Sequence, residues 1–207
     1  MATTRRVGTE KSKTRAVLLD SAVRLMLEQG YAAVSYRSLA AKAGVTAGLV
    51  QYYFPTFDDL FVALVRDRSA RTLKKLEKGL RGERPLHAIW EYANNKDAAA
   101  LTAELTAAAN HRKPIRAELA QAGEEARARA LAAVARTAEK QRLLGEEVSA
   151  DVMVFLLTSL PRMVIMEQST GMTTSHAETM AFLEAFLARV EPDEPGEPDE
   201  GDAGEGA

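Results

Sequence analysis

Helix-forming residues dominate this sequence, and they limit its fold more than any other feature. Alanine occurs 37 times, concentrated between residues 88 and 138, and only four of the seven prolines precede residue 190. Alanine has the highest helix propensity, whereas proline interrupts helices. No alternating apolar and polar run is bounded by hairpin turn residues, so a β-sheet has no obvious source. The sequence predicts an all-α protein.

Capping residues and apolar periodicity predict where the helices lie. The first helix is expected from about Ser12 to Gln29, with an apolar stripe on one face. Ser35 and Thr46 are suitable N-caps for two short helices, and Thr56 opens a long helix toward Leu80. The remaining helices are expected at 85–94, 97–109, 114–142, 150–169 and 175–190.

Several functional classes have little support in the composition. The chain has no cysteine, and its three histidines are scattered at positions 87, 111 and 176, which argues against a zinc cluster or a histidine-based triad. We therefore expect no enzyme, metal or cofactor. The apolar run Val152–Leu157 is far shorter than the roughly 20 residues that span a bilayer. The N-terminus lacks the apolar segment of a signal peptide, so a cytoplasmic protein is expected.

Charge is segregated along the chain. Residues 1–56 carry eight basic and three acidic side chains, whereas residues 191–207 carry eight acidic and no basic ones. This asymmetry favours a nucleic-acid-facing N-terminal end and a solvated acidic tail. We predict a basic flexible arm (1–11), a DNA-binding domain (12–65), a helical ligand-binding and dimerisation domain (66–190) and a disordered acidic tail (191–207).

Residues 35–54 have the spacing of a helix-turn-helix. Two short helices are separated by Gly44-Val45-Thr46, where Gly44 permits a sharp turn and Val45 fills the angle between the helices. Val50 and Phe54 turn one face of the second helix inward. The opposite face is then free to enter a DNA major groove.

The free face supplies the predicted DNA contacts. Thr46, Tyr53, Arg37 and the helix amides are suited to phosphate, while Gln51 can pair with adenine. Base contacts are expected from Ala47, Gly48, Leu49, Gln51 and Tyr52. The basic arm can add phosphate or minor-groove contacts through Arg5, Arg6, Lys11 and Lys13.

The order of these motifs resembles the DNA-binding domain of TetR-family transcriptional regulators over about residues 12–65. The resemblance rests on Leu18-Leu19-Asp20-Ser21-Ala22, Leu25-Met26, Gly30-Tyr31, Arg37-Ser38-Leu39-Ala40, Ala43-Gly44-Val45-Thr46 and Tyr52-Tyr53-Phe54-Pro55. It implies a homodimeric repressor whose C-terminal helices bind a small ligand and then spread the two DNA-binding domains. It also implies DNA contacts at the same eight positions from Arg37 to Tyr53. Gln51 and Phe57 depart from the residues most common in that family, tyrosine and lysine.

A ligand pocket is predicted in the helical domain from its aromatic and methionine side chains. As a group these suit an adaptable apolar cavity and a largely apolar ligand, although for each residue taken singly core packing is the favoured explanation. The candidate lining residues are His87, Trp90, Tyr92, Met153, Phe155, Met163 and Met166.

The last two predicted helices are rich in apolar residues, which predicts that they pair across a two-fold axis as a four-helix bundle. Two alternatives to a regulator remain at this stage. One is a helical ligand-binding protein that does not regulate genes, and the other is a helical-bundle enzyme. Sequence-specific DNA binding distinguishes the first, whereas the lack of Glu-x-x-His pairs or an activated nucleophile disfavours the second.

Overall fold

This computed structural model describes the backbone of residues 3–136 and 149–192, with side chains from residue 13 onward. Within these ranges the chain forms α-helices, one short 3-10 helix and no strand, which confirms the predicted all-α class. The elements are α1 (Thr3–Gln29), η1 (Tyr31–Ala33), α2 (Tyr36–Ala43), α3 (Ala47–Tyr53), α4 (Phe57–Leu80), α5 (Pro85–Ala93), α6 (Lys96–Ala109), α7 (Lys113–Arg136), α9 (Ala150–Ser169) and α10 (His176–Val190).

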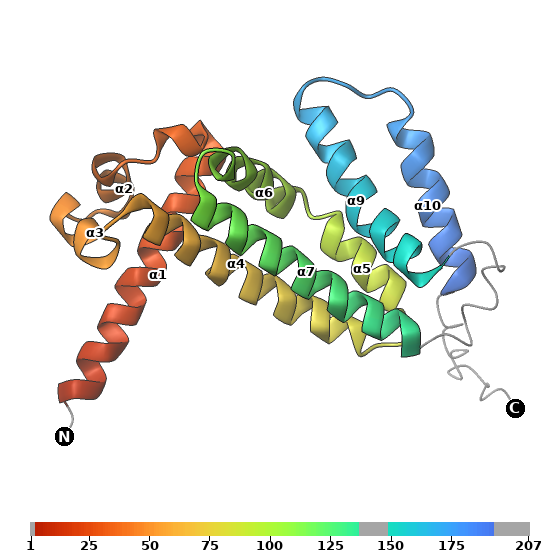
Figure 1. The fold of residues 1–207 in the computed structure, drawn as a ribbon, viewed down its shortest axis with the longest axis horizontal. Helices are drawn as coiled ribbons and strands as arrows, with labels where there is room; N and C mark the ends of the chain where they lie inside the picture. Colours follow the sequence, from red (N-terminus) through yellow and green to blue (C-terminus); the bar gives the residue numbers. More distant parts are fainter. Residues whose placement is uncertain (1–2, 137–148, 193–207) are drawn as a thin grey trace, which may run out of the picture.

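The main departure from the predicted boundaries is at α1. This helix begins at Thr3 rather than near Ser12, so residues 3–11, predicted as a flexible arm, form its first turns. Arginine, lysine and glutamate in this segment are good helix formers and no proline interrupts them, so the helix can extend once its later turns are packed. The N-terminal part of α1 projects away from the other helices (Figure 1).

The helices are arranged along one long axis. In Figure 1, α1, α2 and α3 lie at one end, α4 and α7 run side by side along the middle, and α9 and α10 form an antiparallel hairpin at the other end. The second part of the helix predicted over 114–142, beyond Arg136, lies outside the described residues. Among the described helices, none is both long and apolar enough to cross a membrane.

Two clusters of buried side chains hold this arrangement together. The first joins α1, α2, α3 and the start of α4 to α6 and to Ile115 of α7. The second joins the end of α4 to α5, α7, α9 and α10 through residues such as Ile89, Leu157 and Leu187. Helices α4 and α7 contribute to both clusters, so the two ends of the molecule are joined by shared helices.

Glu191 departs from the sequence prediction of a solvated tail starting at that residue. Its side chain is only 3% exposed. The carboxylate accepts hydrogen bonds from the backbone N–H groups of Leu86 (2.9 Å) and His87 (3.0 Å), and it lies 3.0 Å from Nδ1 of His87. These amides are at the N-terminus of α5, where a helix has no internal acceptors. Glu191 therefore caps α5; residues 193–207 of the predicted tail lie outside the described residues.

Replacing this cap should destabilise the fold. In Glu191→Ala the two α5 amides lose their acceptor in a buried place, which costs about 1–3 kcal/mol of unfolding free energy. Urea denaturation followed by circular dichroism measures the change. Glu184→Ala, at an exposed position of α10, is the control and should leave the midpoint unchanged. Equal midpoints for both variants would contradict the assigned cap.

Candidate nucleic-acid interface and ligand cavities

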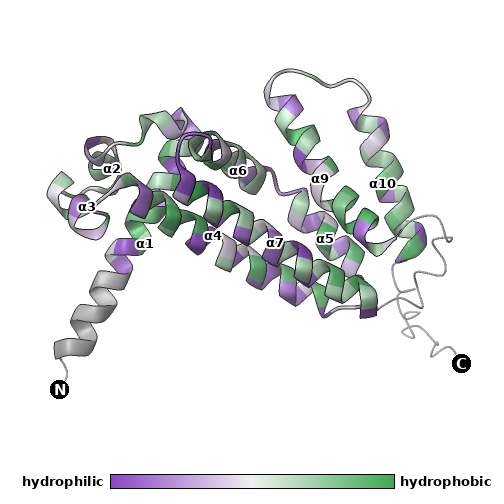
Figure 2. Cartoon of the chain, viewed as in Figure 1, coloured by the Kyte–Doolittle hydropathy of each residue, from purple (hydrophilic) through white to green (hydrophobic). Residues whose placement is uncertain are grey.

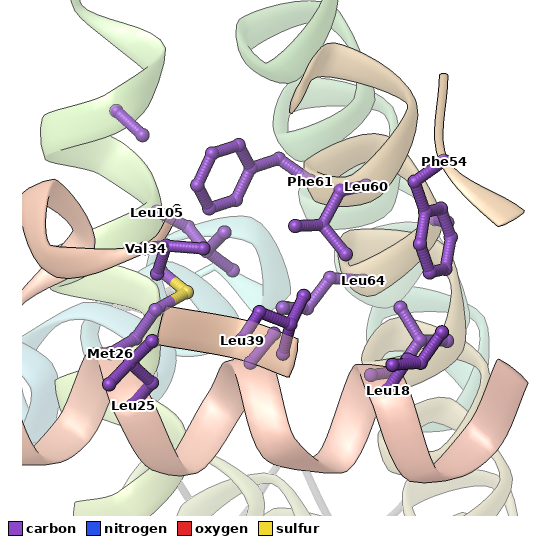
Figure 3. Close-up of a cluster of buried hydrophobic side chains, with 14 of the residues drawn as sticks. Leu18, Leu25, Met26, Val34, Leu39, Phe54, Leu60, Phe61, Leu64 and Leu105 are labelled. Carbon is purple, nitrogen blue, oxygen red and sulfur yellow. The ribbon is translucent and has the colours of Figure 1, made fainter. Parts of the chain in front are cut away.

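The short helix α3 is held in place by its inner face. Val50 and Phe54 are almost completely buried, and they pack in the cluster formed by Leu18 of α1, Leu39 of α2 and Leu60 of α4. Figure 3 shows the Phe54, Leu18 and Leu60 side chains converging between these helices. Because the apolar side of α3 is used entirely for packing, its other side faces solvent.

The turn between α2 and α3 has the predicted chemistry. Gly44 ends α2 with φ +69°, a left-handed conformation that favours glycine. The Ser35 side chain accepts a hydrogen bond from the N–H of Ser38, and Ser38 bonds back to the N–H of Ser35. Thr46 caps α3 by accepting from Leu49 N–H at 3.3 Å. The predicted caps of both helices are therefore confirmed.

Tyr36 fixes the angle between α2 and the following helices, a role that sequence analysis missed. Its hydroxyl donates to the carbonyl oxygens of Phe54 (3.0 Å) and Pro55 (2.9 Å), and its ring stacks on Phe57 at 4.5 Å between centroids. Burial, and secondarily the negative charge of Asp59, raise the pKa of the Tyr36 hydroxyl above its ordinary value. The group therefore stays protonated and able to donate.

The eight predicted DNA contacts lie in α2, at the start of α3 and along α3, and most of them are exposed. Six of these residues are exposed: Arg37, Thr46, Ala47, Gly48, Gln51 and Tyr52. Leu49 and Tyr53 are half-buried. Tyr52 is 64% exposed, and its ring meets that of Tyr53 edge to face at 5.4 Å. The structure thus brings together the residues that the sequence selected.

One further cation flanks this surface. Arg15 of α1 is exposed, and its guanidinium lies 5.5 Å from the centre of the Phe54 ring, next to the end of α3. Sequence analysis assigned the basic residues before it to a flexible arm and gave Arg15 no separate role. Its position could be found only once α1 was known to pack directly on α3.

Three polar contacts link this domain to the rest of the chain. Glu104 of α6 accepts a hydrogen bond from Tyr31 N–H at 2.6 Å. Arg112, which precedes α7, donates to Asp58 at the start of α4 at 2.7 Å. Arg68 of α4 pairs with Asp20 of α1. These contacts fix α1, η1 and α4 against the helical domain.

The predicted ligand pocket is not assembled as the sequence suggested. Trp90 and Met153 are buried in the second core cluster, and His87 is bonded to Glu191. Three residues of α9 instead face outward and are each about half exposed: Phe155, Met163 and Met166. Since α9 has apolar residues on nearly every side, spacing along it could not tell the inner face from the outer.

Of the predicted pocket residues, Tyr92 lines two neighbouring cavities. One cavity, of about 80 Å³, lies between α4, α5, α6, α7 and α9. The other, of about 230 Å³, lies between α5, α7 and α9. Tyr92, Leu119 and Arg162 line both, so the two spaces meet at these residues.

The described residues thus form a helix-turn-helix unit, with α3 facing outward, joined to an all-helical domain that contains cavities. Residues 18–64 match the family model described as bacterial regulatory proteins, tetR family. This match covers 47 of the 207 residues and is confined to the helix-turn-helix unit, where the sequence resembles the same family.

A curated relative and several solved structures agree with this match. The HTH-type transcriptional regulator HbdR from Aromatoleum sp. (strain CIB) is 35% identical over 89 residues, which span 41% of this chain and 39% of that relative.

The solved structures are 20% identical or less and show the shared fold. A putative transcriptional regulator from Saccharomonospora viridis, in complex with choline, has a TM-score of 0.71 at 20% identity and covers 85% of this chain and 96% of its own. A TetR transcription regulator from Haloarcula marismortui has a TM-score of 0.70 at 18% identity, and the match covers 87% of this chain and 98% of its own. FadR from Bacillus subtilis, in complex with stearoyl-CoA, has a TM-score of 0.62 at 16% identity, and the match covers 86% of this chain and 98% of its own.

Two glycines of the helix-turn-helix should respond oppositely to the same substitution. Gly44→Ala forces a side chain into the left-handed region and should destabilise the protein by about 1 kcal/mol. Gly48 is helical and a Cβ there meets no atom within 4 Å, so Gly48→Ala should stabilise it by about 0.5–1 kcal/mol. Thermal denaturation of both variants checks the sign. A destabilised Gly48→Ala protein would contradict the exposed placement of this position.

Proposed function

We propose that this protein is a homodimeric transcriptional repressor that binds a palindromic operator and is released by a small, largely apolar effector. In this proposal residues 12–65 bind DNA, and residues 66–190 bind the effector and form the dimer. The observation that carries it is the outward surface of α3, fixed by burial of Val50 and Phe54. Since the operator is in the cytoplasm, the protein acts there.

The outward residues divide by the DNA groups that they suit. Arg37, Thr46 and Tyr53 are placed for phosphate contacts, which fix the position of the domain on the duplex. Gln51 is the candidate for direct base recognition because its amide matches the N6 and N7 atoms of adenine. The apolar remainder of the surface suits thymine methyl groups: Ala47, Gly48, Leu49 and the Tyr52 ring.

Dimerisation is supported by an apolar face without a covering element. Four apolar residues lie on one face of α9, because they are spaced 3, 8 and 3 residues apart: Val152, Phe155, Met163 and Met166. All four are 48–52% exposed, and Phe182 of α10 is 67% exposed. Figure 2 shows many apolar residues along both helices. An apolar surface of this kind typically marks a protein interface.

Effector release is supported by the position of α6. This helix lines the smaller cavity with Leu101 and Leu105, and its Glu104 accepts a hydrogen bond from Tyr31 of η1, which follows α1. A ligand that moves α6 therefore acts on the DNA-binding domain. It can release DNA only if it binds the DNA-incompetent spacing of the two domains more tightly than the competent one. The choline and stearoyl-CoA complexes show that related folds hold small molecules.

DNA binding can be tested by selecting genomic fragments with the purified protein and measuring affinity at several salt concentrations. Arg37→Ala should weaken binding to all sequences and reduce the slope of log affinity against log salt by about one, because one phosphate contact is lost. Gln51→Ala should cost about 1–3 kcal/mol on the selected site alone and leave the slope unchanged.

The matched control for these variants is Arg189→Ala, which removes an exposed arginine of α10 at the opposite end of the molecule. It should bind like the unmodified protein. Absence of any enriched, two-fold symmetric site at low salt would refute the regulator and favour a ligand-binding protein that does not regulate genes.

Dimerisation can be tested by placing charge on the apolar face. Phe182→Glu should convert a dimer into a monomer at micromolar concentration, because an unpaired carboxylate would be buried in the interface. Sedimentation equilibrium gives the mass. Leu27→Glu, at a 41% exposed position of α1, is the control and should remain dimeric. A monomeric unmodified protein would overturn this part of the proposal.

A further inference from the structure

Arg162 lies where the two cavities meet, and its contacts differ from those of the other arginines that line them. The guanidinium carbon of Arg162 lies 5.3 Å from the centre of the Tyr92 ring. Among residues 13–136 and 149–192, no carboxylate or other hydrogen-bond acceptor pairs with it. A guanidinium has five N–H donors, and a ring face satisfies none of them as a carboxylate would.

The other arginines at these cavities already have partners. Arg68 pairs with Asp20 and lies 3.7 Å from Asp67. Arg127 donates to Ser159 at 3.3 Å and stacks on Phe155 at 5.0 Å. Arg162 is therefore the cation at this junction whose donors are available to a small molecule.

The surrounding side chains favour an anion over a cation. The smaller cavity is lined by two arginines and no carboxylate. Glu124 is the carboxylate lining the larger cavity, and it is exposed. Ser69 adds a hydroxyl donor, whereas the Thr72 and Thr102 hydroxyls donate to helix carbonyls. An apolar wall is supplied by Val65, Leu101 and Leu105. A partly buried cation without a counter-charge is costly, and a bound anion removes that cost.

We propose that the effector is a small monocarboxylic acid whose carboxylate pairs with Arg162 and whose apolar body lies beside Tyr92. This inference rests on the proposed effector-responsive function and specifies its ligand class. The size follows from the cavities of about 80 and 230 Å³. For comparison, a dry apolar cavity of about 150 Å³ holds one benzene molecule. The acid therefore has a single ring or a short aliphatic chain.

The test uses the full-length protein without DNA. Straight-chain carboxylates of two to ten carbons, cyclohexanecarboxylate and benzoate are added at millimolar concentration, each beside its uncharged amide and beside sodium chloride of equal ionic strength. At least one acid should raise Tm and give a saturable calorimetric isotherm, while its amide gives a smaller shift.

Variants then assign the binding to Arg162. Arg162→Met should raise Kd for that acid at least about tenfold, and Arg162→Lys should retain part of the affinity, because lysine keeps the charge but loses bidentate geometry. Arg189→Met is the matched control, since Arg189 stacks on Phe186 at 5.6 Å outside the cavities. Its Kd should equal that of the unmodified protein.

The outcomes separate this inference from the proposed function. No shift with any acid, equal shifts with acid and amide, or undiminished binding in Arg162→Met would each overturn the ligand class. If the acid binds through Arg162 but leaves operator affinity unchanged, the ligand class stands and the proposed effector response fails.

Discussion

The seven residues of α3 form only two turns, and a helix of this length is unstable alone in water. Its persistence depends on burying Val50 and Phe54 against α1, α2 and α4. That dependence explains why the outward surface of α3 can consist of small and polar residues such as Ala47, Gly48 and Gln51. The stability of α3 comes from its other side, so the outward residues are free to be chosen for recognition rather than for folding.

The helical domain divides its apolar residues between an internal core and an uncovered face. Leu157 and Leu187 are buried in the second cluster, whereas Phe155 and Phe182 face solvent from the same two helices. A helix hydrophobic on several sides normally contacts protein on several sides. In addition, the cavities beside Arg162 interrupt the packing of α5, α6, α7 and α9. The proposed dimer would cover the exposed face, and the proposed effector would fill the cavities.

Local signals explain why the helices and turn of the helix-turn-helix unit were predicted well from sequence. Ser35, Gly44, Thr46 and Thr56 act through hydrogen bonds or backbone angles within a few residues, so their roles can be inferred without the fold. The cavity residues depend instead on which helix faces meet. Arg162 and Tyr92 are 70 positions apart, and no periodicity relates them. Glu191 was obscured by the acidic composition of the residues after it, although its buried role depends on distant α5.

The hydrogen bond between Glu104 and Tyr31 limits how far α6 can move relative to η1 while the contact persists. At 2.6 Å it is a charge-assisted hydrogen bond, which weakens steeply with length and angle. Glu104 is one residue from Leu105 of the cavity wall, and Gly30, whose φ of +82° favours glycine, turns the chain directly before Tyr31. A shift of α6 by about one ångström would therefore be enough to break the contact. In the proposed effector response, the movement of α6 that is needed is thus much smaller than a helical turn.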